Sequence, residues 1–191
     1  TCNSFSKSYN NHGQTGLISI PSAEIHDEQS IYFTFNRSTY SKIGTITVTP
    51  FNWLEASYFY YRPDDLLWGS AKGLYLDKGF NVKFSYKPRA NNLPRFAIGL
   101  DDFAGTGQFT REYIASTYDF KNIKLTTGVG WGKYVGESSI NNPLEFLNEK
   151  FGTRPTQSQN FDLGGTPSYD LWFRGDATLF GGIEFKLNQI K

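Results

Sequence analysis

Large apolar and polar residues alternate along several stretches of this chain. Residues 80–87 (Phe-Asn-Val-Lys-Phe-Ser-Tyr-Lys) alternate without a break, and the same period of two recurs in residues 54–61, 123–132 and 178–187. A period of two is typical of a β-strand with one apolar and one polar face. The pattern predicts a sheet that either wraps a soluble core or turns its apolar face to lipid.

The connections between the predicted strands alternate in length, with the two longest at residues 63–78 and 133–173. This alternation indicates an up-and-down antiparallel meander with one plain end and one elaborated end, as in outer-membrane barrels. We therefore predict an all-β transmembrane barrel over residues 30–191. Residues 1–29 form an N-terminal lead-in, of which the polar residues 1–16 are expected to be flexible. The eight predicted strands are residues 30–37, 43–50, 54–62, 79–87, 95–102, 109–118, 123–132 and 174–187.

Composition narrows the class of protein. The chain has 191 residues, enough for one domain, and its net charge of +1 does not favour a nucleic acid as partner. Aromatic residues make up 17%, which suits strands and the aromatic girdles of membrane barrels. No apolar run approaches the roughly 18 residues of a membrane helix. In a barrel, alternation would average the hydropathy of the strands to a low value.

The charged residues of the strands predict which face is enclosed. A lysine facing lipid at mid-depth costs about 2–4 kcal/mol, so we expect Lys83 and Lys124 to point into the barrel and pair with acidic side chains there. A soluble barrel with a polar, ligand-holding interior is the alternative, but its outer surface would be a large apolar patch. The predicted interior network consists of Glu55, Lys83, Arg95, Asp101, Glu112, Lys124 and Glu184.

Three glycines, Gly128, Gly130 and Gly132, share the inward face of one predicted strand. Glycine in a strand usually marks a bend or the close approach of a bulky group. We interpret these positions as sites of sheet curvature, with Phe180 of the neighbouring strand filling the space above them.

No motif predicts catalysis. Asp101 and Asp102 are adjacent in a strand and therefore point to opposite faces. His12 and His26 lie too close to the N-terminus for a triad or metal site, and no cofactor motif is evident. The chain contains no methionine, which indicates an N-terminus that has been processed or trimmed, and Cys2 is a candidate for lipidation. The sequence predicts a protein that is not an enzyme and holds no metal or cofactor.

Several motifs, in this order, resemble the YjbH/GfcD-type proteins of Gram-negative bacteria, and together they extend over nearly the whole chain. They are Gly16–Ala23, Gly99–Gly107, Arg111–Tyr113, Gly128–Gly132, Trp172–Gly175 and Phe180–Phe185.

This resemblance implies an outer-membrane β-barrel, often a lipoprotein, that takes part in exopolysaccharide or capsule production and export. The expected partners are outer-membrane lipid, exopolysaccharide and other export-machinery proteins. Family members are much longer, so the chain is expected to be a short relative, a fragment or the N-terminal part of a larger barrel. Two alternatives stay open: a general barrel of the porin or adhesin type without a polysaccharide role, and a soluble β-barrel that binds an amphipathic ligand.

An eight-stranded barrel has an interior just wide enough for its own side chains, which favours an anchor or adaptor over a conduit. The long connections at residues 63–78 and 133–173 would then contact glycan or partner proteins. Aromatic residues in and beside these connections are candidates for stacking on sugars or for anchoring at the membrane interface. They are Trp68, Tyr75, Tyr134 and Trp172.

Overall fold

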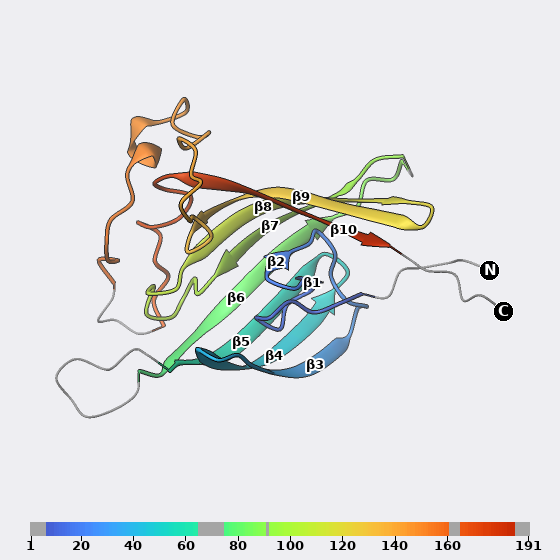
Figure 1. Ribbon diagram of the computed structural model, residues 1–191, viewed down its shortest axis with the longest axis horizontal. Helices are drawn as coiled ribbons and strands as arrows, with labels where there is room; N and C mark the ends of the chain where they lie inside the picture. Colours follow the sequence, from blue (N-terminus) through green and yellow to red (C-terminus); the bar gives the residue numbers. More distant parts are fainter. Residues whose placement is uncertain (1–6, 65–74, 91, 161–164, 186–191) are drawn as a thin grey trace.

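The computed structural model describes residues 7–64, 75–90, 92–160 and 165–185, and within them the fold is all-β. One antiparallel sheet has the strand order β10-β9-β8-β7-β6-β5-β4-β3, so every strand pairs with its neighbours in sequence (Figure 1). The described part of the chain contains no helix with the length and apolarity needed to cross a bilayer. The elements are β1 Gly16–Leu17, β2 Ile20–Pro21, β3 Ser30–Arg37, β4 Ser41–Phe51, β5 Leu54–Pro63, β6 Asp77–Tyr86, β7 Arg95–Asp101, β8 Arg111–Phe120, β9 Ile123–Gly132, the 3-10 helix η1 Glu149–Gly152, and β10 Ala177–Phe185.

The predicted meander is confirmed. β3 and β9 begin and end at the predicted residues, and the other strands overlap their predicted ranges. The connections also alternate as expected, since β4 and β5 are joined by residues 52–53 alone, whereas β9 and β10 are joined by residues 133–176. One end of the sheet, the short-turn end, therefore carries tight turns, and the other, the long-loop end, carries the long connections.

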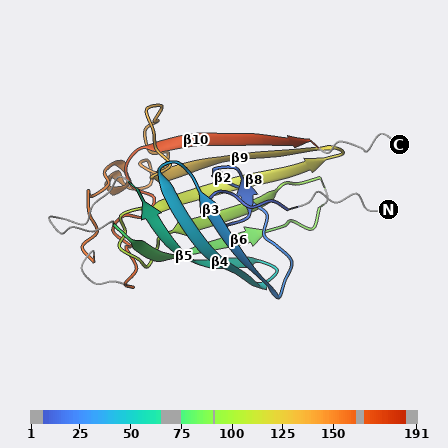
Figure 2. The ribbon, with the colours of Figure 1, turned by 60° about the horizontal axis from the view of Figure 1, so that its bottom comes forward.

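The prediction of a sheet closed by these eight strands is wrong. Closure requires the first and last strands to pair, but among the described strands β3 pairs only with β4 and β10 only with β9. Besides β9, the first residue of β10, Ala177, forms a single bridge with Ile140 of the long connection. The sheet is instead a curved trough with two free edges (Figures 1 and 2).

The two faces of the trough differ in character as the alternation predicts. On the convex face, large apolar side chains are exposed on strands from β3 to β10. On the concave face, threonine, serine, asparagine and charged side chains are buried, including Glu55, Lys83 and Lys124. The exposed apolar residues of the convex face are Ile31, Phe33, Phe35, Ile46, Tyr58, Tyr60, Phe80, Phe84, Tyr86, Phe96, Ile98, Phe120, Ile123, Leu125, Leu179, Ile183 and Phe185.

The concave face is buried because residues 7–29 lie on it, with the β1–β2 hairpin inside the curve of the sheet (Figure 1). We call residues 7–29 the N-terminal segment. It reaches from one edge of the trough to the other, since Gly13 lies against Thr34 of β3 and Leu17 lies against Gly182 of β10. The lead-in predicted to be flexible is thus, from residue 7 onward, part of the interior of the fold.

Aromatic rings above glycines fill the rest of the concave face. A side chain on any of these glycines would occupy the position of a ring, which explains why the strands carry glycine there. Phe180 lies above Gly128 as predicted, but Gly130 lies beneath Tyr134, and Gly132 lies against Thr110 and Arg154. The same pairing of a ring with a glycine recurs on other strands. The cross-strand pairs are Gly79 with Phe59, Gly99 with Tyr113 and Gly128 with Phe180, and Tyr134 lies in the same way above Gly130.

We predict that Gly99→Ala lowers the free energy of unfolding by about 1–3 kcal/mol, because the new methyl group overlaps the buried Tyr113 ring. Gly44→Ala is the matched control, because a Cβ at this strand position meets nothing within 4 Å. Urea unfolding followed by circular dichroism measures both. Equal effects at the two positions would show that the ring does not depend on the glycine.

Candidate functional site

The best-enclosed part of the charged interior is an ion pair between β5 and β6. Lys83 Nζ lies 3.1 Å from Glu55 Oε1, and both side chains are 1% exposed. Lys83 also donates hydrogen bonds to the carbonyl oxygens of Thr15 (2.6 Å) and Glu24 (3.2 Å). Glu55 accepts from the backbone N–H and the hydroxyl of Thr15. Thus the ion pair holds the N-terminal segment, and the segment supplies the remaining partners of the ion pair.

A second ion pair lies towards the β10 edge. Lys124 Nζ is 2.7 Å from Glu24 Oε2 and 3.9 Å from Glu184 Oε2. The backbone N–H of Ala23 donates to Thr117 Oγ1 (2.9 Å), and Ser85 Oγ donates to the Ala23 carbonyl (2.6 Å). The structure therefore places Lys124 beside Glu184, as predicted, but its nearest acid belongs to the N-terminal segment.

The remaining predicted interior basic residue on β7, Arg95, lies beside Thr117 in the register of β7 and β8. Its guanidinium donates to Ser85 Oγ at 3.4 Å. It makes no ion pair within the described residues.

A third cluster forms near the long-loop end around Asp101. Its carboxylate is 2.7 Å from Arg111 Nη2, and it accepts hydrogen bonds from Gln14 Nε2 (2.6 Å) and the Tyr134 hydroxyl (3.4 Å). Arg111 Nη1 lies 2.6 Å from His12 Nε2. Burial and the positive charge of Arg111 lower the pKa of His12 well below its usual range, so the neutral ring accepts this hydrogen bond.

Glu112 is not part of this interior, and its predicted place there is wrong. Tyr113 packs on the concave side, so the adjacent Glu112 points to the convex side of β8. There Arg154 contacts both carboxylate oxygens, at 2.7 and 2.9 Å, and the Phe173 backbone N–H donates at 3.1 Å. This bidentate pair fixes part of the connection at residues 133–176 over the ends of β8 and β9.

The predicted aromatic and lipidation sites have different surroundings. Tyr75 is only 4% exposed, and Tyr134 packs against Phe180 and Tyr113, so neither ring is placed to stack on a sugar at the surface. Trp172 forms an edge contact with the exposed Tyr169 in the long connection. Trp68 and Cys2 lie outside the described residues.

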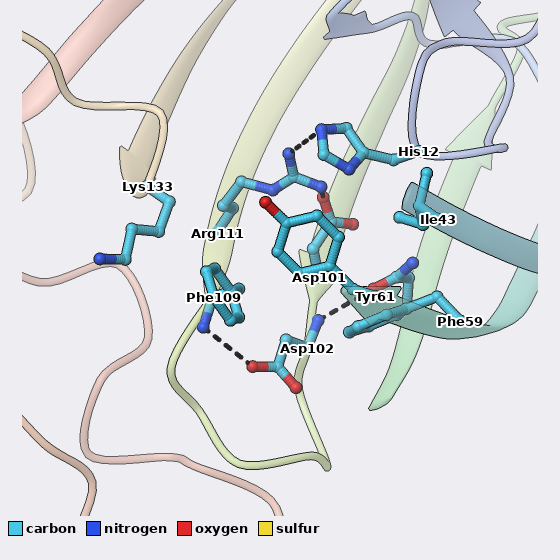
Figure 3. Close-up of a pocket in the computed structure, with 10 residues that line it drawn as sticks. His12, Ile43, Phe59, Tyr61, Asp101, Asp102, Phe109, Arg111 and Lys133 are labelled. Atoms are coloured by element: carbon cyan, nitrogen blue, oxygen red, sulfur yellow. Dashed lines mark hydrogen bonds and ion pairs between the residues drawn. The ribbon is translucent and has the colours of Figure 1, made fainter. Parts of the chain in front are cut away.

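A cavity of about 290 Å³ opens beside the third cluster (Figure 3). Aromatic side chains from β5 and the β7–β8 connection form part of its wall, and Arg111 and Asp102 form part of the rest. Arg111 Nε and Asp102 Oδ1 are buried and have no hydrogen-bond partner in the described part of the chain. The cavity therefore offers one unused N–H of Arg111 and one unused carboxyl oxygen of Asp102 beside apolar rings. Its lining residues are His12, Ile43, Phe59, Tyr61, Asn81, Asp101, Asp102, Phe109, Arg111 and Lys133.

Asp102 has an unusual position at this cavity. Its φ of 54° is in the left-handed region, its backbone N–H donates to Asn81 Oδ1 (2.9 Å), and its Oδ2 accepts from the Phe109 N–H (3.1 Å) (Figure 3). Burial, with a further contribution from Asp77, raises the pKa of Asp102 to about 8. At neutral pH this side chain is therefore largely a protonated acid.

Sequence reasoning identified most of the charged residues of the strands but missed their partners. Gln14, Thr15 and Glu24 lie in a polar segment without alternation, and Arg154 lies in a long connection. No short-range pattern pairs such residues with a strand. Within the described ranges, no group of three or more histidine, cysteine or acidic side chains is arranged to hold a metal ion.

We predict that Glu55→Gln and Lys83→Met each lower the free energy of unfolding by roughly 3–5 kcal/mol, because each leaves a buried charge without its partner. The double variant should lose much less than the sum, and a double-mutant cycle from denaturant unfolding measures the coupling. Asp27→Asn, which breaks the exposed pair with Lys7, is the control and should leave the unfolding midpoint unchanged. Additive losses in the cycle would contradict the ion pair.

Comparison with known proteins identifies the family of this chain. The sequence model of the YjbH family, described as "Exopolysaccharide biosynthesis protein YbjH", matches residues 8–190. A protein of Escherichia coli (strain K12) named "Uncharacterized lipoprotein YjbH" is 28% identical over 185 residues, which cover 94% of this chain and 26% of that protein. The chain thus spans about a quarter of the length of this relative. No solved structure matches this chain significantly. The chain belongs to the YjbH family of exopolysaccharide biosynthesis proteins.

Proposed function

We propose that this chain forms part of a transmembrane β-barrel in the outer membrane of a Gram-negative bacterium. There it supports the assembly or export of exopolysaccharide or capsule without catalysing a reaction. The observation that carries the proposal is the convex face. Between the two ends of the sheet, the outward side chains of β3 to β10 include no charged residue. Exposing such an apolar face to water is energetically unfavourable, whereas the same face matches the hydrocarbon of a bilayer.

The dimensions of the sheet support a membrane location. A transmembrane β-strand needs about 9–11 residues, and β4, β5, β6, β8, β9 and β10 have 11, 10, 10, 10, 10 and 9. Aromatic side chains mark the short-turn end, where Phe51, Trp53 and Phe84 stack in sequence. Exposed aromatic residues at this level are typical of a membrane interface.

The free edges support a barrel larger than eight strands. An edge strand presents a row of unpaired backbone N–H and C=O groups, which is tolerated in lipid only when another strand pairs with it. The E. coli relative is about four times as long as the region that it shares with this chain. We infer that further strands of the longer protein pair with β3 and β10, and that the N-terminal segment lies against the inner wall of the complete barrel.

The polysaccharide role rests on membership of the YjbH family. The relative's name describes a lipoprotein, which supports acylation of Cys2 as a second attachment to the envelope. A non-enzymatic role is favoured because the buried acids Glu55, Asp101 and Glu112 are engaged in ion pairs that hold the fold together. The partners that we propose are outer-membrane lipid, exopolysaccharide and other proteins of the export machinery.

The membrane location predicts that Ile98→Lys prevents insertion. Ile98 is exposed in the middle of the convex face, where a lysine in lipid costs about 2–4 kcal/mol. Tyr169→Lys, at an exposed position in the long connection, is the control and should insert normally. The measurement is the fraction of protein recovered in liposomes with heat-modifiable gel migration. Insertion of Ile98→Lys to the level of the unmodified protein would exclude a lipid-facing convex surface.

The proposed role predicts that deletion of the gene lowers the amount of secreted polysaccharide, and that the unmodified gene restores it. Restoration by the Ile98→Lys variant should fail. Polymer is quantified in the culture medium and on the cell surface. An unchanged amount of polymer in the deletion strain would exclude the role in polysaccharide assembly or export, while leaving the membrane location open.

A further inference from the structure

The charged residues on the convex face gather at one place. Four of them lie on adjacent strands at the long-loop end, and all four are basic: Arg37 of β3, Lys42 of β4, Arg62 of β5 and Lys78 of β6. We call these four residues the basic row. The other charged residue on this face of the described strands, Glu112, lies beneath the long connection and is bound by Arg154.

The basic row places like charges directly opposite one another. In the register of the sheet, Arg37 is the partner of Lys42, and Lys42 is also the partner of Arg62. Like charges in directly opposed positions destabilise a sheet. An arrangement of this kind is expected where an anion from outside the fold compensates the repulsion.

Little of this charge is compensated within the described part of the protein. Arg62 pairs with Asp64, with 3.0 Å between Nη2 and Oδ1. The side chains of Arg37, Lys42 and Lys78 make no ion pair or hydrogen bond with another described residue. Arg37 and Lys78 are exposed, and Lys42 is half-buried. Three basic side chains are therefore available to a ligand.

The surroundings of the row indicate what kind of anion it holds. On each strand the next outward residue towards the centre of the sheet is uncharged. It is aromatic on three strands, with Phe35 beside Arg37, Tyr60 beside Arg62 and Phe80 beside Lys78, and on β4 it is a glycine. The row thus lies at the border between the apolar surface and the long-loop end. A ligand that fits both has anionic groups at the level of the row and hydrocarbon against the apolar surface. Basic clusters at a membrane border bind the headgroups of anionic lipids in this way.

We propose that the basic row binds the phosphate groups of a phosphorylated glycolipid in the outer leaflet of the membrane. This inference rests on the proposed membrane location. Outer-membrane barrels have short periplasmic turns and longer outer loops, so the long-loop end is placed at the outer leaflet. The guanidinium of Arg37 contacts a phosphate through two N–H groups, and Lys42 and Lys78 act as point charges beside it. The acyl chains lie against the aromatic side chains of β3, β5 and β6.

The test compares two triple variants of the full-length protein, purified in detergent. Arg37→Gln/Lys42→Gln/Lys78→Gln removes the uncompensated charges and leaves the Arg62–Asp64 pair intact. Lys87→Gln/Arg89→Gln/Lys121→Gln removes the same charge from exposed positions at the short-turn end. Native mass spectrometry measures binding of doubly phosphorylated lipid A, of lipid A without phosphates, and of inorganic phosphate.

We expect the unmodified protein and the short-turn variant to bind phosphorylated lipid A equally. The basic-row variant should bind it roughly 100-fold more weakly, given the contribution of each basic residue near an anionic lipid surface. Removal of the lipid phosphates should weaken binding to the unmodified protein to a similar extent. Without lipid, the basic-row variant should unfold at the same or a higher denaturant concentration, because repulsion between strands is relieved.

Three results would overturn the inference. They are unchanged binding by the basic-row variant, equal binding of lipid A without phosphates, and inorganic phosphate bound as tightly as the lipid. If the triple variant folds poorly, Lys42→Gln alone gives the same comparison, with a loss of roughly fivefold. If the unmodified protein inserts but shows no preference for phosphorylated lipid A, this inference alone is contradicted, whereas failure of the unmodified protein to insert would contradict the proposed function.

Discussion

The fold depends on the contacts between the N-terminal segment and the charged concave face. A buried lysine or glutamate is tolerated only with a partner and with its remaining hydrogen bonds satisfied. Lys83 and Glu55 find each other across β5 and β6, but the backbone of Thr15 and Glu24 completes their coordination. The sheet thus cannot keep these charges out of water without the segment. The strands therefore curve around a strip of polar chain together with the aromatic rings of the concave face.

Much of this architecture could be predicted because the apolar surface faces outward. The alternation is regular over residues 80–86 of β6 and in β9, so both the strands and the face of each residue are evident from local sequence. The N-terminal segment could not be recognised in this way. It packs on a polar surface and is therefore polar itself, and a polar stretch without period is indistinguishable from a flexible one. The same limit explains Glu112, whose partner Arg154 lies far away in a connection without regular structure.

Closure of the sheet was the other feature beyond the reach of sequence. Eight strands in a meander are compatible with a small barrel or with one wall of a larger one, and the hydropathy pattern is the same in both. What differs is whether the first strand pairs with the last. In this structure the space between β3 and β10 is bridged on the inside by the N-terminal segment, through Gly13 and the β1–β2 hairpin. The chain can therefore hold its curvature without closing.

The contact between Leu17 and Gly182 has a consequence for the order of folding. The two residues are far apart in the sequence, so the interior of this region cannot be completed until β10 is in place. Contacts of such long sequence separation slow folding. Until β10 is in place, the earlier strands expose their apolar convex face and a concave face whose charged contacts are incomplete. Surface exposed in this way makes a partly folded region prone to aggregation.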